Sequence, residues 1–389
     1  MGVDRQEQIR IAKRLLAHIQ GGTAEAAPHQ YRVPVDRYLD EDLWAREVES
    51  FYKRLPIVAG LSCELAGPDS YKAEEMVGVP VLLVRDDTGK LNAFLNVCRH
   101  RSAPVASGRG QASRFICPYH AWTYDRAGKL VGVAAEDTFG PVDRATHSLT
   151  RLPCAERAGL MFVGLTPGMP FDIDAFLAGV DRHIAAGESD TLHVQGPLTI
   201  AAPNWKVTME GHLESYHFSA LHRNSIGPVT YNNVGAIDRW GPHLLITVAH
   251  RHITDLLGKP ESEWHPLRES MMTAQYVLFP GASVTLIGNG MMVQCVRPGT
   301  NIGTSTNTLV MGFRQSADHP QAAAEQAAFL DLNRQVLGQE DYATGFQIQK
   351  GLRSGAQSEV LLGMNEPGVI YFHEAMAELL GDAPVPANA

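Results

Sequence analysis

Hydrophobic and polar positions divide the chain into stretches with different periodicities. Apolar residues recur at helical spacing over residues 5–20 and again over 36–53, each time among charged neighbours, as expected for amphipathic helices. Between about residues 55 and 151 the pattern changes to short apolar runs separated by Gly, Pro and Asp, which is typical of antiparallel strands. An N-terminal helical segment is therefore expected to precede a β-rich domain.

The second half of the chain mixes the two patterns. Strand-like runs are predicted at 192–200, 244–249, 276–278, 283–287, 291–296 and 308–313. Helices are predicted at 171–187, 207–221, 322–350 and 369–380. Successive strands with helices between and after them predict an antiparallel sheet on which helices pack.

Together these patterns predict an α+β fold with three parts. Residues 1–54 form an N-terminal helical segment that packs on the C-terminal domain, and residues 55–165 form an antiparallel β domain. Residues 166–389 form a helix-on-antiparallel-sheet domain.

Composition narrows the classes of function. The chain has 389 residues, 44% of them hydrophobic, which is enough for sizeable cores. Its net charge of −9, without a basic stripe, argues against nucleic-acid binding. No apolar run approaches the roughly 18 residues of a membrane span, and the first 20 residues lack the apolar core of a signal peptide. A soluble cytoplasmic protein is expected.

Two Cys-His pairs stand out in the predicted β domain. The sequence reads Cys98-Arg99-His100, then sixteen residues, then Cys117-Pro118-Tyr119-His120. Two thiolates and two imidazoles form the ligand set of a Rieske 2Fe-2S centre, in which two Cys hold one iron and two His the other. The neutral imidazoles raise the reduction potential, which suits the cluster to relaying single electrons.

A structural zinc site and a Cys98–Cys117 disulfide are the alternatives for these four residues. Zinc fingers group Cys with Cys and His with His, whereas each Cys here is paired with a His. The chain has five Cys, an odd number, and no secretory signal, which argues against a disulfide framework. The iron–sulfur interpretation is favoured.

A second cluster of candidate ligands lies in residues 210–222, which hold three His and two Glu. Two His and one carboxylate on one face of an iron leave positions open for O2 and substrate. His217 and His222 are five residues apart, so on an ideal helix they point about 140° apart. Either the helix ends between them or it contains a π-bulge. His212 precedes His217 by the same spacing, so spacing alone leaves the pair undecided.

The chain resembles the catalytic (α) subunit of a Rieske non-haem iron oxygenase of the ring-hydroxylating type. The family pattern is Asn-Trp-Lys, Glu-Asn, an acid, Tyr-His, four residues and His. It reads here Asn204-Trp205-Lys206, Glu210-Gly211, Glu214, Tyr216-His217 and His222. The resemblance spans about residues 36–380. Two positions depart from it: Ala121 replaces a Gly, and Gly211, with His212 beside it, replaces the Asn.

The resemblance implies a mononuclear Fe(II) bound by His217 and His222, and places His212 in the pocket or behind the ligands. The third ligand is implied on a late helix, shortly before the run Gly351-Leu352-Arg353. Asp341 matches that position best, and Glu340 is the second choice.

Partners follow from the same resemblance. In the family the cluster and the iron of one chain are too far apart for fast electron transfer, so the short path runs to a neighbouring subunit. A homotrimer or a multiple of it is expected, with Glu214 bridging His217 of one chain and His120 of the next. No Gly-rich nucleotide fingerprint follows a strand. A separate flavin reductase, directly or through a ferredoxin, is therefore expected to bring electrons from NAD(P)H.

The expected reaction is hydroxylation of an aromatic substrate with O2, as mono- or dioxygenation. Apolar residues proposed for the pocket would favour a small apolar organic substrate; they are Leu213, Phe218, Leu221, Val229, Met291, Met292 and Phe346. Met291 and Met292 could instead alternate across a strand into a core. His250, Arg251 and His252, predicted on a strand, could meet a carboxylate.

Two other functions are the alternatives. One is oxidative N- or O-demethylation of a methylated amine, a quaternary ammonium or a methoxy compound. A quaternary ammonium site would need an aromatic cage, and Trp205, Trp240, Trp264 and the scattered Tyr residues do not mark one. The other is a pure Rieske electron carrier, from which the content of mononuclear iron would distinguish an oxygenase.

Overall fold

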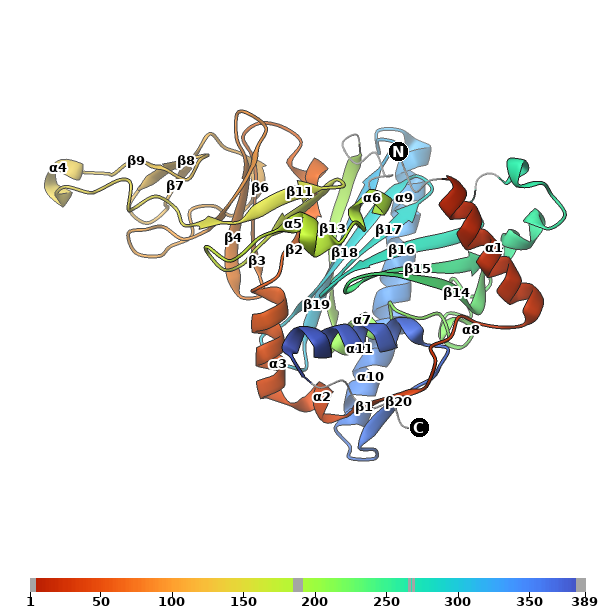
Figure 1. Cartoon of the computed structure of the whole chain (residues 1–389). Coiled ribbons are helices and arrows are strands. Elements are labelled where there is room, and N and C mark those ends of the chain that lie inside the picture. The colour runs from red at the N-terminus through yellow and green to blue at the C-terminus, as the bar shows by residue number, and fades with distance from the viewer. Residues whose placement is uncertain (1–4, 185–191, 265–266, 268–269, 383–389) are drawn as a thin grey trace.

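A computed structural model describes residues 5–184, 192–264, 267 and 270–382. Figure 1 shows a narrow lobe of short strands on the left and a broad body on the right, in which helices surround one large sheet. The lobe comes from the first half of the chain and the body mainly from the second. The expected α+β class is confirmed.

The lobe is built from three antiparallel sheets. The largest has the order β10-β5-β4-β3-β6 and comprises Arg151–Leu152, Leu91–Leu95, Val79–Arg85, Ser70–Met76 and Gly108–Gln111. The outermost has the order β7-β8-β9 and comprises Arg114–Ile116, Thr123–Asp125 and Leu130–Gly132. The third, next to the body, has the order β11-β12-β2 and comprises Cys154–Arg157, Leu160–Val163 and Ile57–Leu61.

The body is organised by one seven-stranded antiparallel sheet in the order β13-β19-β18-β17-β16-β15-β14. Its strands in that order are His193–Ala202, Ser305–Phe313, Gly290–Pro298, Ala282–Ile287, Met272–Leu278, His243–His250 and Thr230–Trp240. Six of them match the six predicted runs, with β13 beginning one residue later than predicted, whereas β14 was not predicted. The helices are α7 (Trp205–Glu210), α8 (Phe218–Leu221), α9 (Pro320–Asn333), α10 (Tyr342–Leu352) and α11 (Pro367–Leu380).

The two faces of the large sheet contact different parts of the molecule, because side chains alternate between the faces along each strand. On one face Leu245, Tyr276, Val284 and Met291 belong to a core that also contains the buried residues of α1 (Arg5–Gly21). On the other face the sheet meets the helices of the second half of the chain. This second face is where chemistry-bearing side chains and a cavity lie.

The N-terminal segment is attached to the body at several points. Strand β1 (Tyr31–Pro34) pairs with β20 (Glu359–Leu362), and α1 contacts β14 and β15. The predicted helix at 36–53 is present as α2 (Asp36–Leu39), α3 (Glu41–Glu47) and a π-helical turn.

Three sequence predictions need correction. The helix expected at 207–221 is interrupted: α7 ends at Glu210 and α8 begins at Phe218. Of the trio His250, Arg251 and His252, only His250 lies on a strand; the other two begin the 3-10 helix η5 (Arg251–Leu256). The helix expected at 171–187 is two short pieces, Ile173–Leu177 and Asp181–Ile184, and its last predicted residues fall outside the described ones.

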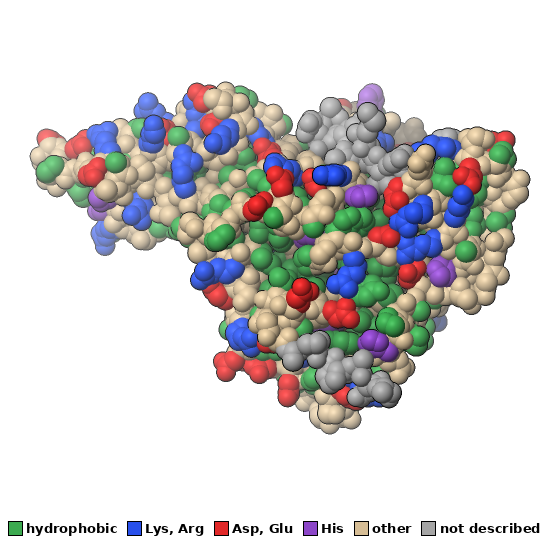
Figure 2. Space-filling model, viewed as in Figure 1, with side chains coloured by type: hydrophobic (Ala, Val, Ile, Leu, Met, Phe, Trp, Pro, Cys, Tyr) green, Lys and Arg blue, Asp and Glu red, His purple; other side chains and the backbone are tan. Residues whose placement is uncertain are grey.

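Among the helices of the described residues, none is long and apolar enough to cross a membrane. Figure 2 shows Lys and Arg side chains on the visible face interleaved with Asp and Glu rather than gathered in a basic stripe.

The Asn-Trp-Lys motif fastens the N-terminal segment to the body. Asn204 caps α7 by accepting a hydrogen bond from the Lys206 N–H, and its amide donates to the Tyr38 carbonyl. Trp205 is fully buried against Phe51 and Tyr52. Lys206 Nζ pairs with Glu47 Oε2 at 2.5 Å, with side chains only 1% and 2% exposed. The motif thus positions α7, the helix that leads into the candidate metal site.

The Lys206–Glu47 pair gives the first prediction. Glu47→Leu should leave a buried, uncompensated ammonium and lower the free energy of unfolding by about 3–5 kcal/mol. Adding Lys206→Met should recover most of that loss, because an apolar pair needs no desolvated charge. Urea unfolding of the two single variants and the double variant measures the coupling; equal stability of Glu47→Leu and the parent would contradict it.

Candidate metal centres and the adjoining cavity

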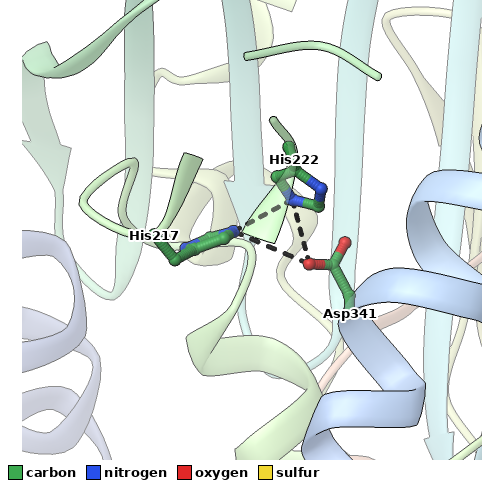
Figure 3. Close-up of side chains that lie close together, drawn as sticks. All are labelled: His217, His222 and Asp341. Carbon is green, nitrogen blue, oxygen red and sulfur yellow. Dashed lines mark hydrogen bonds and ion pairs between the residues drawn. The ribbon is translucent and has the colours of Figure 1, made fainter. Parts of the chain in front are cut away.

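Three side chains from distant parts of the chain converge at the second face of the sheet. His217 and His222 flank α8, and Asp341 lies at the junction of the π-helix η7 (Arg334–Asp341) and α10. His217 Nε2 lies 3.2 Å from His222 Nε2, and Asp341 Oδ1 lies 3.1 Å from the latter and 3.6 Å from the former. Figure 3 shows the three side chains pointing toward one another. One ion could meet one atom of each.

The local backbone explains why two His five residues apart can face one point. His217 precedes the single turn of α8 and His222 follows it, so neither is bound to the angular register of a continuous helix. Of the two alternatives offered by the sequence, the first holds, because α8 ends at Leu221, between His217 and His222. The π-helical distortion occurs instead in η7, the segment that ends at Asp341, as π-turns often do at functional sites.

A glutamate orients each of the two imidazoles. His217 Nδ1 is bonded to Glu214 Oε1, and His222 Nδ1 is bonded to Glu340 Oε2 at 2.6 Å. An ionised carboxylate only accepts, so each Nδ1 carries the proton and each Nε2 presents its lone pair toward Asp341. This is the arrangement by which metal-binding His are usually held.

Glu340 therefore lies behind His222 rather than beside Asp341. Its carboxylate also accepts hydrogen bonds from Ser225 at 2.7 Å and Gln335 at 3.0 Å. Burial opposes its charge, but these bonds and the one from His222 outweigh it and lower the pKa of Glu340. The sequence offered Glu340 only as a substitute third ligand, and its role toward His222 was missed. Its place directly before Asp341 was the only local signal.

Electrostatics favour a positive charge between these groups. Burial opposes a charge on His222, but the carboxylates of Asp341 and Glu340 outweigh it and raise the pKa of that imidazole. A divalent cation satisfies two converging nitrogen lone pairs and a carboxylate better than a shared proton does, because it contacts all three donors at once. The three residues fit a mononuclear iron with open positions.

The three side chains His217, His222 and Asp341 are called the converging group. His212 borders the site but does not belong to this group. Its Nε2 lies 3.3 Å from the Tyr342 hydroxyl, and its carbonyl accepts from Gln275. Burial lowers the pKa of His212, so the ring is neutral there.

A second cluster near α7 was not predicted. Glu210 Oε1 accepts from the Tyr38 hydroxyl at 2.7 Å and lies 2.9 Å from His373 Nε2. His373 is on α11 and Tyr38 on α2, so Glu210 joins the N-terminal segment, α7 and the last helix. Glu210 belongs to the family pattern and was therefore noticed, but its partners Tyr38 and His373 lie too far away in the sequence to be predicted.

The two Cys-His pairs follow strands β5 and β7 of the lobe. The rings of His100 and His120 are 4.6 Å apart, and Cys98 and Cys117 are free and buried. His120 Nδ1 is buried and has no partner among the described residues. Burial raises the pKa of the Cys98 thiol, and its neighbour Cys117 adds to that shift.

These observations match the donor set of a 2Fe-2S cluster. Two thiolates side by side in a buried place need a cationic partner, which iron provides. The unpartnered Nδ1 of His120 is a ligand atom of the required kind. Ala121, which replaces the family's Gly, has φ +53°, the left-handed region that Gly adopts without strain. The turn is therefore retained although Ala121 is strained in this conformation.

A cavity of about 310 Å³ ends at His217, His222 and Asp341. Its floor is the second face of the large sheet and its walls come from α8, α9 and η7. Among the described residues that line it there is no Lys, Arg, Trp or Tyr, and its aromatic side chains other than His are Phe218 and Phe329. Of the residues predicted for a pocket, Phe218, Val229 and Met292 line this cavity.

The remaining pocket candidates lie elsewhere. Met291 is fully buried in the core on the opposite face, Leu213 is buried in the core around Trp205, and Phe346 packs beside Tyr342. Leu221 lines a second cavity of about 270 Å³, which lies between α7, α10 and β20 and also reaches His217 and Asp341. Arg251 and His252 are exposed and do not line the larger cavity, whereas His250 does.

Two family models match the chain. One, described as ring hydroxylating alpha subunit (catalytic domain), matches residues 183–382. The other, described as Rieske [2Fe-2S] domain, matches residues 56–152. The first accounts for the converging group and the cavity, the second for the two Cys-His pairs.

Curated relatives are similar over different lengths. The carnitine monooxygenase oxygenase subunit of Escherichia coli K12 is 26% identical over 370 residues, or 90% of this chain and 94% of that protein. The glycine betaine monooxygenase oxygenase subunit of Chromohalobacter salexigens is 31% identical over 194 residues, 49% of this chain and 43% of that protein. The latter match therefore spans less than half of the relative's length.

The fold is shared with solved structures. The quaternary ammonium Rieske monooxygenase CntA, solved in complex with an inhibitor, superposes with a TM-score of 0.78 at 22% identity, covering 91% of this chain and 96% of that one. The likeness includes both the lobe and the body.

The distinct places of Asp341 and Glu340 give a prediction. Asp341→Ala should lose mononuclear iron, whereas Glu340→Gln should retain it with an affinity lower by about 10–100-fold, since a supporting partner is weakened but no donor atom is lost. Iron titration of the metal-free protein measures this, with cluster absorbance as an internal control. Asp331→Ala, an exposed acid on α9, should change neither metal. Full iron binding by Asp341→Ala would assign the third ligand elsewhere.

Proposed function

We infer the activity from one premise: this chain belongs to the ring hydroxylating alpha subunit family of Rieske non-haem iron oxygenases. It is the terminal oxygenase component of a Rieske system, with a 2Fe-2S cluster and a mononuclear iron as cofactors. We propose that it demethylates a small methylated ammonium compound by hydroxylating one methyl group. The observation that best supports oxidation of a small substrate at the metal site is the cavity that ends at His217, His222 and Asp341.

Methylated ammonium compounds are favoured as the substrate class by the relatives. The carnitine monooxygenase subunit aligns with 90% of this chain, so lobe, large sheet and late helices all take part in the match. A second relative is named for glycine betaine, another compound of that class. The cavity of about 310 Å³ suits a small organic molecule, because ligand sites begin at about that volume.

Each named residue has a definite task in this proposal. His217, His222 and Asp341 would hold the iron, which supplies O2 activation when the cluster delivers electrons. Glu214 and Glu340 keep the proton on each Nδ1 and so keep both Nε2 atoms available as donors. The apolar walls around Phe218 exclude water and hold the C–H bond to be oxidised next to the three ligands.

Electron delivery calls for partners. Cys98, His100, Cys117 and His120 would hold the cluster. Cys117 and His120 lie between β7 and β8, which Figure 1 shows well away from α8. We propose that a homotrimer, or a multiple of it, brings the lobe of one copy to the body of the next. Glu214 would then join His217 of one copy to His120 of the neighbour. A separate reductase would supply the electrons, with a ferredoxin between them or without one.

Hydroxylation of an aromatic ring is the second candidate. Within the described part of the chain the cavity lining has no Trp or Tyr and no Lys or Arg, whereas a quaternary ammonium group is usually held by an aromatic cage. Phe218, Phe329 and the aliphatic wall would suit an uncharged aromatic ring equally well. The description of the matching family model, ring hydroxylating, agrees with this candidate.

A single-turnover experiment separates the two reactions. The loaded, reduced protein is mixed without air with methylated ammonium compounds or with aromatic compounds, and O2 is then admitted. Demethylation puts one oxygen atom into a methyl group and the other into water, using two electrons, and releases formaldehyde. We expect formaldehyde together with a product one methyl group lighter. An aromatic product gaining one or two oxygen atoms, without formaldehyde, would reject demethylation.

Glu214 gives a separate prediction about electron delivery. Glu214→Gln should retain both metals but slow reoxidation of the reduced cluster by O2 and substrate by at least about 10-fold, because the orienting carboxylate is weakened. Stopped-flow absorbance of the cluster in a single turnover measures the rate. Unchanged reoxidation with full product yield would remove Glu214 from the electron path.

A further inference from the structure

The floor of the cavity carries a row of uncharged polar side chains. Gln275 of β16 and Thr285 of β17 are direct partners across the sheet, and Gln294 of β18 lies on the same face, because Met292, the cross-strand partner of Thr285, precedes it by two residues. All three line the cavity. We call Gln275, Thr285 and Gln294 the polar floor. An ordinary sheet core would place apolar residues here.

Thr285 is the informative member of the polar floor. It is only 5% exposed, and its hydroxyl oxygen has no hydrogen-bond partner among the described residues. A buried hydroxyl without a partner costs about 1–3 kcal/mol, so such groups are normally satisfied. Gln294, 3% exposed, uses one end of its amide to bond Asn307 at 2.8 Å. Hydrogen-bonding capacity is thus left over where the cavity meets the sheet.

The polar floor is separate from the candidate ligands. No hydrogen bond in the described structure joins Gln275, Thr285 or Gln294 to the side chains of His217, His222 or Asp341. Gln275 reaches only the backbone carbonyl of His212. A substrate that offers a carbon to the metal site could therefore contact the polar floor with another group.

The charge of that other group follows from the lining. Acidic side chains of the cavity, Glu214 and Asp341, are both engaged at the metal site, and no Lys or Arg lines it within the described residues. His250 is bonded to Ser270 and Thr273, and burial lowers its pKa. A buried carboxylate without a cation is costly, whereas a hydroxyl or carbonyl needs only a hydrogen bond.

We propose that the polar floor is a specificity site that binds an uncharged hydrogen-bonding group of the substrate, a hydroxyl or a carbonyl, through Thr285 and its neighbours. The inference deepens the proposed function, since it rests on the cavity being the substrate site. It also predicts that this chain does not prefer carboxylate-bearing compounds such as carnitine and glycine betaine, after which the relatives are named.

The test compares probes that differ only in one group. A methylammonium series contains choline with a hydroxyl, glycine betaine with a carboxylate and ethyltrimethylammonium with neither. An aromatic series contains benzyl alcohol, benzoate and toluene. Calorimetric titration of the holoenzyme without O2 gives the dissociation constants. In the series that the enzyme accepts, the hydroxyl probe should bind about tenfold more tightly than the other two, the worth of one well-placed hydrogen bond.

A matched pair of variants assigns the effect to the floor. Thr285→Val should remove most of that roughly tenfold preference and leave binding of the probe without a polar group unchanged. Because it deletes an unpartnered hydroxyl, it should not lower the unfolding temperature. Thr247→Val is the control. Thr247 is also buried, and its hydroxyl has no partner among the described residues, but its neighbours Ile246 and Val248 line the cavity, so Thr247 points to the opposite face. This control should bind all probes like the parent.

The outcomes separate the two proposals. A hydroxyl preference lost in Thr285→Val but seen only in the aromatic series would support the polar floor and reject demethylation. Tightest binding by carboxylate probes in both series, or a hydroxyl preference that Thr285→Val leaves intact, would overturn the polar floor. Failure of both hydroxyl probes to bind more tightly than their apolar partners would overturn it as well, whichever series is oxidised.

Discussion

The bond between each imidazole Nδ1 and a glutamate is the constraint on which the site depends. Without Glu214 and Glu340, the rings of His217 and His222 could rotate or change tautomer, and their Nε2 atoms would not converge at 3.2 Å. The two carboxylates come from different elements, one just before α8 and one from the π-helix η7. The converging group therefore exists only when both segments are docked on the large sheet.

Docking of these segments is supported from both ends of the chain. The buried Lys206–Glu47 pair fastens α7 to the N-terminal segment, and Glu210 of α7 bonds both Tyr38 and His373. Strand β1 also pairs with β20. The N-terminal segment is thus part of the body's packing.

The sequence predicted local features well and long-range ones poorly. The Cys-His pairs and the succession of strands depend on short spacings and on alternation, so both could be read directly. The break between Glu210 and Phe218 was missed, although Gly211, the C-cap residue of α7, is of the type at which helices often end. The bond between Glu340 and His222 was missed because the two residues lie 118 positions apart in the sequence. Thr285 gave no signal at all, since a Thr in a strand looks the same on either face.

The most direct test of the central claim is Mössbauer spectroscopy of the protein reconstituted with 57Fe. If His217, His222 and Asp341 bind a metal as proposed, the spectrum will contain, beside the two irons of the 2Fe-2S cluster, a high-spin Fe(II) signal of the kind given by nitrogen and oxygen ligands. We expect that signal at one iron per chain. A spectrum of cluster iron alone, in protein whose cluster is fully loaded, would contradict the mononuclear site and leave an electron carrier.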